Sequence, residues 1–186
     1  METFIIVGLG NPGREYATTR HNVGWIALDF IAKELGIKIS KIKFKATYGE
    51  TITNGKKIIL LKPQTFMNSS GISVKAAAEY YKIRPQNIIV ISDDINLQSN
   101  KIRIRKSGSD GGHNGLANII YARIKLLSEN KDRSLRSREY RYSSRGLGAR
   151  KLFGRRALRT CKAASGRIRG LSLDNRGENR SGDEQI

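Results

Sequence analysis

Residues 4–13 read FIIVGLGNPG, four apolar residues followed by a glycine-rich turn. An uninterrupted apolar run of this length is typical of a strand buried on both faces, and the glycines predict a sharp turn after it. Such strands occur in parallel or mixed sheets that helices cover on both sides. The segment therefore predicts an α/β fold whose first strand ends at the sheet edge where open α/β sheets bind ligands.

The rest of the first 121 residues alternates between helical and strand periods. Apolar residues from Val23 to Ile31 recur at helical spacing, and Gly36 is a helix stop signal. Asn54-Gly55 predicts a hairpin turn. Further strands are expected at 41–48, 58–61, 88–91 and 102–105, and further helices at about 69–81 and 116–120. Together these predict a three-layer α/β/α sandwich around a mixed, mostly parallel twisted sheet.

The same glycines also match a dinucleotide-binding pattern, G-x-G-x-x-G, at Gly8, Gly10 and Gly13. In that motif the third glycine opens a helix, and an acidic residue ends the second strand about 20 residues later. Here seven mostly polar residues follow Gly13 before the helical pattern begins, and the acid at that distance, Glu34, lies inside the helix. Both features argue against a nucleotide, so we expect no cofactor. The glycines would instead present Asn11 at the strand end.

Charge and composition divide the chain near residue 125. Residues 1–121 contain 17 Lys and Arg against 9 Asp and Glu, a net charge of +8 in which lysine dominates. Residues 122–186 contain 18 against 7, a net charge of +11, and are rich in arginine, serine and glycine without a sustained period. We therefore expect a domain at 1–125 and an Arg-rich region at 126–186 that is irregular or disordered. The excess charge predicts a polyanionic partner such as nucleic acid, or else a solvated basic surface.

Composition also argues against several classes of protein. No stretch approaches the ~18 consecutive apolar residues of a membrane span, and no signal-peptide pattern precedes the first strand. The single cysteine, Cys161, rules out an internal disulfide and a four-cysteine zinc site. We expect a soluble, cytoplasmic protein with neither a membrane partner nor a bound metal.

Few side chains are suited to catalysis. The two histidines, His21 and His113, each lie in a polar cluster before an expected helix. A neutral histidine can take a proton from water, but one at a helix start can equally be a capping or solvated residue. Asp93-Asp94 ends a buried strand, where a carboxylate can orient a histidine, form a turn or bind a metal. No G-x-S-x-G elbow is present and Cys161 lies in the irregular region, so a covalent nucleophile has no candidate.

Several motifs occur in the order found in one family of enzymes. They are GLGNPG at 8–13, TRHNVG at 19–24, KPQTFMN at 62–68, Asp93-Asp94, and GGHNGL at 111–116. Over this span the chain resembles the bacterial peptidyl-tRNA hydrolases, which cleave the ester between a peptide and the terminal ribose of tRNA and so recycle tRNA from prematurely released chains. The resemblance implies hydrolysis without a metal or cofactor, by a monomer whose partner is tRNA.

Four catalytic residues follow from the resemblance. His21 would be the general base that activates water, and Asp93 would orient it and stabilise its charged form. Asn68 and Asn114 would position the water or the ester and support the oxyanion. By residue type alone, both asparagines are equally consistent with ordinary helix N-caps.

Contacts with the substrate follow from it too. Asn11 would contact the peptide main chain, and Arg103 and Arg105 occupy strand positions where the family carries basic residues that meet tRNA phosphate. Besides Asn68 and Asn114, the residues that would line the cleft are Tyr16, Phe66 and Met67.

The family pattern stops near residue 125. The family continues with an arginine- and glycine-rich strand, a Pro-Gly loop and amphipathic helices that cover the sheet, and none of these follows in order. We therefore expect an unpaired sheet edge and exposed apolar faces. The switch from lysine to arginine suggests a shifted reading frame or a replaced terminus. Sequencing the coding DNA tests this, and an intact frame with no family-like ending in another frame would contradict it.

Three functions remain open from the sequence. The first is hydrolysis of peptidyl-tRNA. The second is a non-catalytic RNA-binding relative of the same fold, or an inactive product of a frameshift. The third is a dinucleotide-dependent enzyme, which a nucleotide titration without binding would remove.

Overall fold

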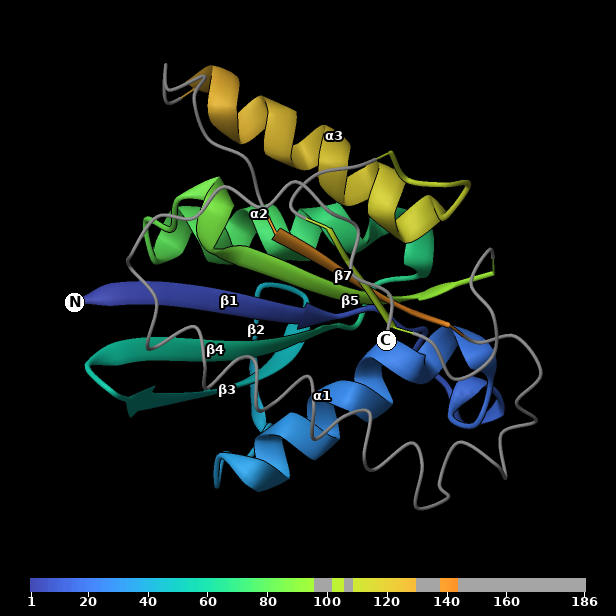
Figure 1. The fold of residues 1–186 in the computed structure, drawn as a ribbon, viewed down its shortest axis with the longest axis horizontal. Helices are drawn as coiled ribbons and strands as arrows, with labels where there is room; N and C mark the ends of the chain where they lie inside the picture. Colours follow the sequence, from blue (N-terminus) through green and yellow to red (C-terminus); the bar gives the residue numbers. More distant parts are fainter. Residues whose placement is uncertain (96–101, 106–108, 130–137, 144–186) are drawn as a thin grey trace.

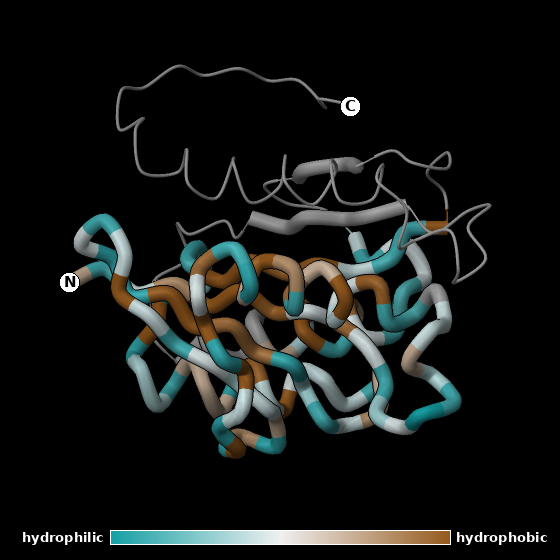
Figure 2. Tube along the Cα trace, turned by 90° about the horizontal axis from the view of Figure 1, so that it is seen from below, coloured by the Kyte–Doolittle hydropathy of each residue, from teal (hydrophilic) through white to brown (hydrophobic). Residues whose placement is uncertain are grey.

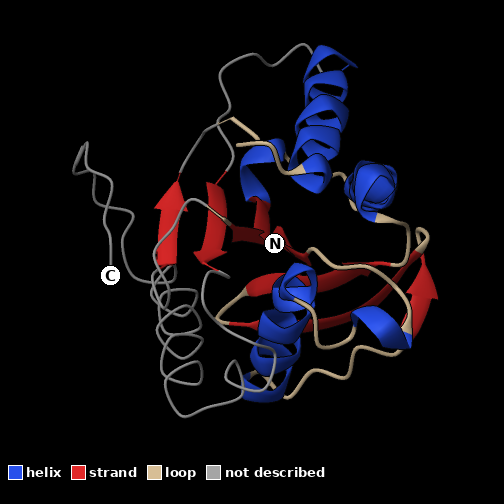
Figure 3. Cartoon of the chain, turned by 90° about the vertical axis from the view of Figure 1, so that its right-hand side faces the viewer, coloured by secondary structure: helices blue, strands red, loops and turns tan. Residues whose placement is uncertain are grey.

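The protein forms three layers in a computed structural model that describes residues 1–95, 102–105, 109–129 and 138–143. At residues 20, 102–105, 123–129 and 138–143 it describes the backbone alone. Helix α1 (Val23–Glu34) covers one face of a sheet, and helices α2 (Ser70–Tyr80) and α3 (Asn114–Glu129) cover the other (Figure 1). Figure 3 shows the strands between these helices. The predicted α/β/α sandwich is confirmed. In the described part of the chain, no helix is both long and apolar enough to cross a membrane.

Within the described part of the chain, seven strands form one mixed sheet, in the order β2-β3-β4-β1-β5-β7-β6. Strands β4, β1, β5 and β7 run parallel to one another at its centre, whereas β2, β3 and β6 pair antiparallel at its two sides. Half of these strand pairs are therefore parallel and the other half antiparallel. The strands are β1 (Glu2–Gly8), β2 (Lys41–Lys43), β3 (Ala46–Thr53), β4 (Lys56–Pro63), β5 (Ile88–Asp94), β6 (Ile102–Arg105) and β7 (Arg138–Ser143).

The apolar run of β1 supplies both cores of the domain. Ile5 and Val7 lie in the cluster between the sheet and α2/α3, and Ile6 lies in the cluster between the sheet and α1. Successive strand residues point to opposite faces, so an uninterrupted apolar run is what a strand covered on both sides requires. Figure 2 shows the hydrophobic residues concentrated inside the domain and the hydrophilic ones toward its periphery.

Two glycines bring the start of α1 directly onto the sheet. A Cβ atom on Gly24 would lie 2.4 Å from the Ile91 carbonyl oxygen and 2.4 Å from the Leu9 backbone nitrogen. A Cβ atom on Gly8 would lie 2.3 Å from the Gly24 carbonyl oxygen. Contacts this close are possible only without side chains, and they place the residues just before α1 at the carboxyl ends of β1 and β5.

One expected strand is in fact two. The alternating segment 41–48 is split by a two-residue turn at Phe44 and Lys45, which have φ angles of 59° and 52°. Tight hairpin turns need positive φ at both positions and usually contain Asn-Gly, as at Asn54-Gly55, where the predicted turn is confirmed. The single-strand prediction was wrong because Phe-Lys carries no turn signal.

The structure also differs from expectation beyond residue 125. Helix α3 continues to Glu129, and β7 lies between β5 and β6 within a region expected to be irregular. The expected loss of a sheet strand was therefore wrong for this part of the sheet, since β7 pairs with β5 from Arg138 to Ser143 and β6 pairs with β7. The alternation of Tyr140 and Tyr142 with Arg141 is a strand signal that the high arginine content obscured. The other residues of 126–186 lie outside the described part of the chain.

Candidate active site

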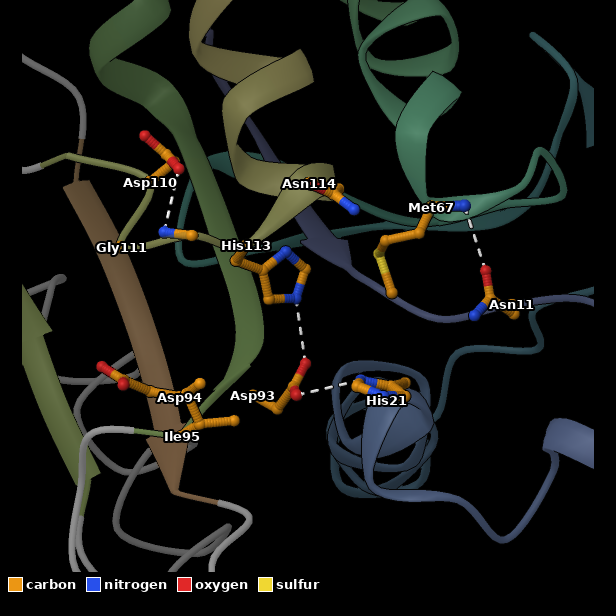
Figure 4. Close-up of a pocket in the computed structure, with 11 residues that line it drawn as sticks. Asn11, His21, Met67, Asp93, Asp94, Ile95, Asp110, Gly111, His113 and Asn114 are labelled. Atoms are coloured by element: carbon orange, nitrogen blue, oxygen red, sulfur yellow. Dashed lines mark hydrogen bonds and ion pairs between the residues drawn. The ribbon is translucent and has the colours of Figure 1, made fainter.

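Five segments meet at the carboxyl ends of the parallel strands and enclose a cavity of about 320 Å³ (Figure 4). The loop after β1 contributes Asn11, the end of β5 contributes Asp93, and the 3₁₀ turn before α1 contributes His21. Met67 and Asn114 come from the turns that begin at η3 (Met67–Ser69) and α3. The full lining is Asn11, His21, Met67, Asp93, Asp94, Ile95, Asp110, Gly111, Gly112, His113 and Asn114.

Asp93 lies between the two histidines of the chain. Its Oδ2 atom is 3.1 Å from Nδ1 of His21, and its Oδ1 atom is 2.9 Å from Nε2 of His113. The carboxylate side chain is 3% exposed, the His113 side chain 13% and the His21 side chain 54%. One buried carboxylate therefore orients two imidazole rings, of which only that of His21 is open to solvent.

Hydrogen bonds to the rings indicate where their protons lie. The backbone N–H groups of Gly115 and Leu116 donate to Nδ1 of His113 at 3.1 and 3.3 Å, so that nitrogen carries no proton. The proton of neutral His113 is therefore on Nε2, which donates to Asp93. His21 donates to the same carboxylate through Nδ1, which leaves the lone pair of its Nε2 free to accept a proton.

The pKa of Asp93 is lower than that of an ordinary aspartate. Burial alone raises it, but the hydrogen bond from His113 and the charges of both histidines outweigh this effect. The carboxylate therefore stays ionised at neutral pH. It can hold His21 in place and stabilise the imidazolium that forms when His21 takes a proton.

This shift predicts how stability depends on pH. Because folding lowers the pKa of Asp93, its contribution is fully present above the pKa of an unfolded aspartate, roughly 3.9, and is lost as the pH falls through the folded value. We expect the difference in unfolding free energy between the native chain and Asp93→Asn to be constant from pH 6 to about 5 and to shrink below about pH 4. Urea titrations across this range measure it, and a difference that grew on acidification would contradict the assignment.

A second network fixes Asn11. The Asn22 side chain accepts a hydrogen bond from the Asn11 backbone N–H at 2.7 Å and donates one to the Asn11 carbonyl oxygen at 3.1 Å. The Asn11 side-chain oxygen in turn accepts from the Met67 N–H at 3.0 Å. With that oxygen engaged, the Nδ2 group is the part of Asn11 that remains able to donate to a ligand.

The glycines of the first loop are used for packing. A Cβ atom on Gly10 would lie 2.7 Å from the Trp25 ring, so the indole covers the backbone that a nucleotide diphosphate would have to approach. Gly13 precedes the three-residue 3₁₀ helix η1 (Arg14–Tyr16) and does not open the α-helix α1, which begins at Val23. Both observations favour the packing interpretation over the dinucleotide motif.

The predicted site residues separate into two groups. The structure brings together Asn11, His21, Met67, Asp93 and Asn114 around the cavity. Three others are not among its lining residues: Tyr16 is half-buried in η1, Asn68 is exposed in η3, and Phe66 is 65% exposed. Arg103 and Arg105 are placed by their backbone alone, on the edge strand β6. The roles of all ten predicted site residues stay predictions.

Sequence reasoning gave His113 and Asn22 no role. His113 was noted as a histidine in a polar cluster, but nothing in the sequence shows that its ring contacts Asp93, the carboxylate that also binds His21. Asn22 follows His21 directly and is 2% exposed, and its pairing with Asn11 spans 11 residues of chain. Within the described residues, no group of three or more His, Cys, Asp and Glu side chains is arranged to hold a metal ion.

Comparisons with known proteins identify the family of this chain. The family model described as peptidyl-tRNA hydrolase matches residues 5–126. A peptidyl-tRNA hydrolase of Thermoanaerobacter sp. (strain X514) is 59% identical over 118 residues, which are 63% of this chain and 64% of that protein. One from Clostridium acetobutylicum is 58% identical over 117 residues, 63% of each chain. The chain thus matches somewhat less than two thirds of these relatives' length.

Solved structures give the same result for the fold. The crystal structure of peptidyl-tRNA hydrolase from Acinetobacter baumannii superposes with a TM-score of 0.71 at 28% identity, over 91% of this chain and 86% of that one. A complex of a peptidyl-tRNA hydrolase with N-propanol superposes with a TM-score of 0.70 at 29% identity, with the same coverage. On the match of its family model to residues 5–126, the chain belongs to the peptidyl-tRNA hydrolase family.

Proposed function

We propose that this protein hydrolyses the ester between a peptide and the terminal ribose of tRNA. The observation that carries the proposal is the pairing of half-exposed His21 with buried Asp93 at a cavity in which Nε2 of His21 is free. An ester needs an activated water for hydrolysis at neutral pH, and an oriented imidazole supplies a general base.

The reaction proceeds in two steps on this arrangement. The oxygen of a water molecule bonds to the ester carbonyl carbon while one of its protons passes to Nε2 of His21, and the carbonyl electrons move onto oxygen. The tetrahedral intermediate then collapses, the bond from carbon to the ribose oxygen breaks, and that oxygen takes the proton from His21. Asp93 stabilises the imidazolium between the two steps.

Amide groups are positioned to bind the polar atoms of the substrate. Asn11 donates through Nδ2 to the peptide main chain, and Asn114 at the cavity wall supports the oxyanion. Asn68 positions the water or the ester and supports the oxyanion together with Asn114. Tyr16, Phe66 and Met67 line the cleft that holds the substrate. The proposal includes phosphate contacts by Arg103 and Arg105 and a monomeric, cytoplasmic protein that recycles tRNA during translation.

A non-catalytic RNA-binding protein is the second candidate. The net charge of +11 in residues 122–186 favours it, because affinity for RNA phosphate does not require the catalytic pair. A frameshifted chain would also retain His21 and Asp93 and yet be inactive if residues after 125 are needed for folding or binding.

Release of labelled peptide from a model peptidyl-tRNA by the purified full chain tests the proposal. Turnover above the spontaneous rate supports it. A folded chain that binds tRNA without turnover would establish the RNA-binding alternative. Circular dichroism and thermal unfolding of the same sample identify a chain that is inactive because it does not fold.

A further inference from the structure

The backbone of the turn between β2 and β3 is strained, whereas the backbone of the next hairpin turn, between β3 and β4, is not. Phe44 and Lys45 have φ angles of 59° and 52°, nearly the same as Asn54 and Gly55 at 49° and 71°. Asparagine and glycine tolerate this conformation, whereas a bulky aromatic residue rarely adopts it. Strain of this kind persists only where surrounding contacts impose it, and it is concentrated at functional sites.

The contacts that impose it are specific. The Lys45 carbonyl oxygen accepts hydrogen bonds from the Gln64 N–H at 2.9 Å and the Ser73 hydroxyl at 3.0 Å. The Phe44 ring packs against three tyrosines, with centroid distances of 5.7 Å to Tyr48, 5.3 Å to Tyr80 and 5.9 Å to Tyr81. The turn is thereby fixed to α2 and to the loop that leads to Met67.

This fixed turn presents a basic and aromatic surface, which we name the lysine hairpin: Lys41, Lys43, Lys45 and the Tyr80 ring. All three lysines are exposed, and Tyr80 is 60% exposed. The Lys43 ammonium lies 3.4 Å from the centre of the Tyr80 ring, a cation–π contact that holds charge and ring together.

The carboxylate of Glu50 lies against this group. Glu50 accepts hydrogen bonds from Lys41 at 2.6 Å and from Lys57 at 2.8 Å, and these bonds lower its pKa to about 2. It offsets one lysine charge and holds the Lys41 side chain in place. Lys43 remains as a positive charge over the Tyr80 ring, and Lys45 as an exposed positive charge in the adjoining turn.

The lysine hairpin and the candidate active site lie at the same end of the sheet, where the parallel strands have their carboxyl ends. Ala46 pairs with Pro63 at the carboxyl end of β4, the end at which β1 and β5 reach the cavity. Gln64, bonded to the turn, is three residues from Met67 in the cavity wall. Strand β2 is four strand spacings from β5, roughly 19 Å across the sheet, on the side opposite β6.

We infer that the lysine hairpin binds the phosphate backbone of the substrate RNA, with Tyr80 as a surface on which a base can stack. The inference rests on the proposed function, which brings an RNA to this edge of the sheet. Lysines beside an exposed aromatic ring are the combination that binds nucleic acid strands, and a peptide carries no fixed row of negative charges for them. At about 3.4 Å per nucleotide, the contact falls roughly five or six nucleotides from the ester.

Binding of uncharged tRNA to the full chain, followed by fluorescence anisotropy at several salt concentrations, is the first test. For the double variant Lys43→Gln/Lys45→Gln we expect the slope of log affinity against log salt to fall by about two units, one for each lost phosphate contact. Affinity should drop roughly tenfold at about 0.1 M salt. Lys33→Gln removes one charge from an exposed position on α1, across the sheet, and should leave both values unchanged.

A second comparison places the contact along the RNA. The double variant should lower kcat/KM for full-length peptidyl-tRNA and leave it unchanged for a peptidyl-trinucleotide that is too short to reach the hairpin. Tyr80→Ala should lower tRNA affinity severalfold without changing the salt slope, because stacking releases no counterions.

The variant Lys45→Gly distinguishes an effect of backbone strain on stability from an effect of the lysine charge on RNA binding. Glycine adopts the observed φ freely, so the variant should unfold at the same temperature as the native chain or a higher one, while its tRNA affinity and salt slope fall. Unchanged slopes in the lysine variants would overturn the inference, and a change in oligomeric state instead would assign the surface to self-association. Because anisotropy requires no turnover, a failure of the proposed hydrolysis is recognised separately.

Discussion

Replacing His21 by alanine is expected to lower kcat for peptidyl-tRNA hydrolysis by about 100- to 10,000-fold, the usual contribution of a positioned general base. His21 is the more exposed of the two histidines at the cavity, and its Nε2 is the nitrogen left free by the bond to Asp93. The KM should change little, because the ring takes a proton from water and does not hold the peptide or the RNA. Single-turnover release of labelled peptide measures the effect.

Two further measurements make this result specific. Added imidazole should restore part of the activity of His21→Ala, since the side chain leaves a space beside Asp93 that a free base can enter. Asp93→Asn should also lose activity and should not be rescued, because the carboxylate that orients both rings is missing. Activity of His21→Ala within tenfold of the native chain would remove His21 as the base.

Replacing Gly24 by alanine is expected to destabilise the protein by about 3 kcal/mol or more, although alanine is the better helix former. The new Cβ would lie 2.4 Å from the Ile91 oxygen and from the Leu9 nitrogen, and 2.5 Å from the Leu9 oxygen. All three are backbone atoms of the central strands and the adjoining turn, so no side chain can move aside. Helix α1 would have to shift, and the turn that carries His21 would shift with it. Urea denaturation measures the loss of stability.

Gly36→Ala is the matched control. Gly36 ends the same helix with a φ of 65°, and a Cβ there would meet nothing within 4 Å. Its substitution should cost only about 1 kcal/mol, the strain of a left-handed alanine, and should leave activity unchanged. A loss at Gly24 no larger than that at Gly36 would show that the domain accommodates a Cβ atom at residue 24, and that the close approach of α1 to the sheet does not require glycine there.

The sequence was sufficient wherever the signal is local. The apolar run of β1, the helical spacing from Val23, and Asn54-Gly55 each specify their element through residues adjacent in the chain. The Phe44-Lys45 turn could not be foreseen, because its conformation is imposed by Gln64, Ser73 and three tyrosines distant in sequence.

The candidate site divides in the same way. His21, Asp93, Asn11, Met67 and Asn114 could be named because their motifs resemble those of the peptidyl-tRNA hydrolase family. That His113 shares the carboxylate of Asp93, and that Asn22 fixes Asn11, depends on contacts made only when α1, α3 and β5 pack together. A periodic pattern shows which face of an element is buried. Which hydrogen bonds the site residues form depends on how whole helices and strands pack together. In this domain that packing depends on close backbone contacts such as that of Gly8 with Gly24.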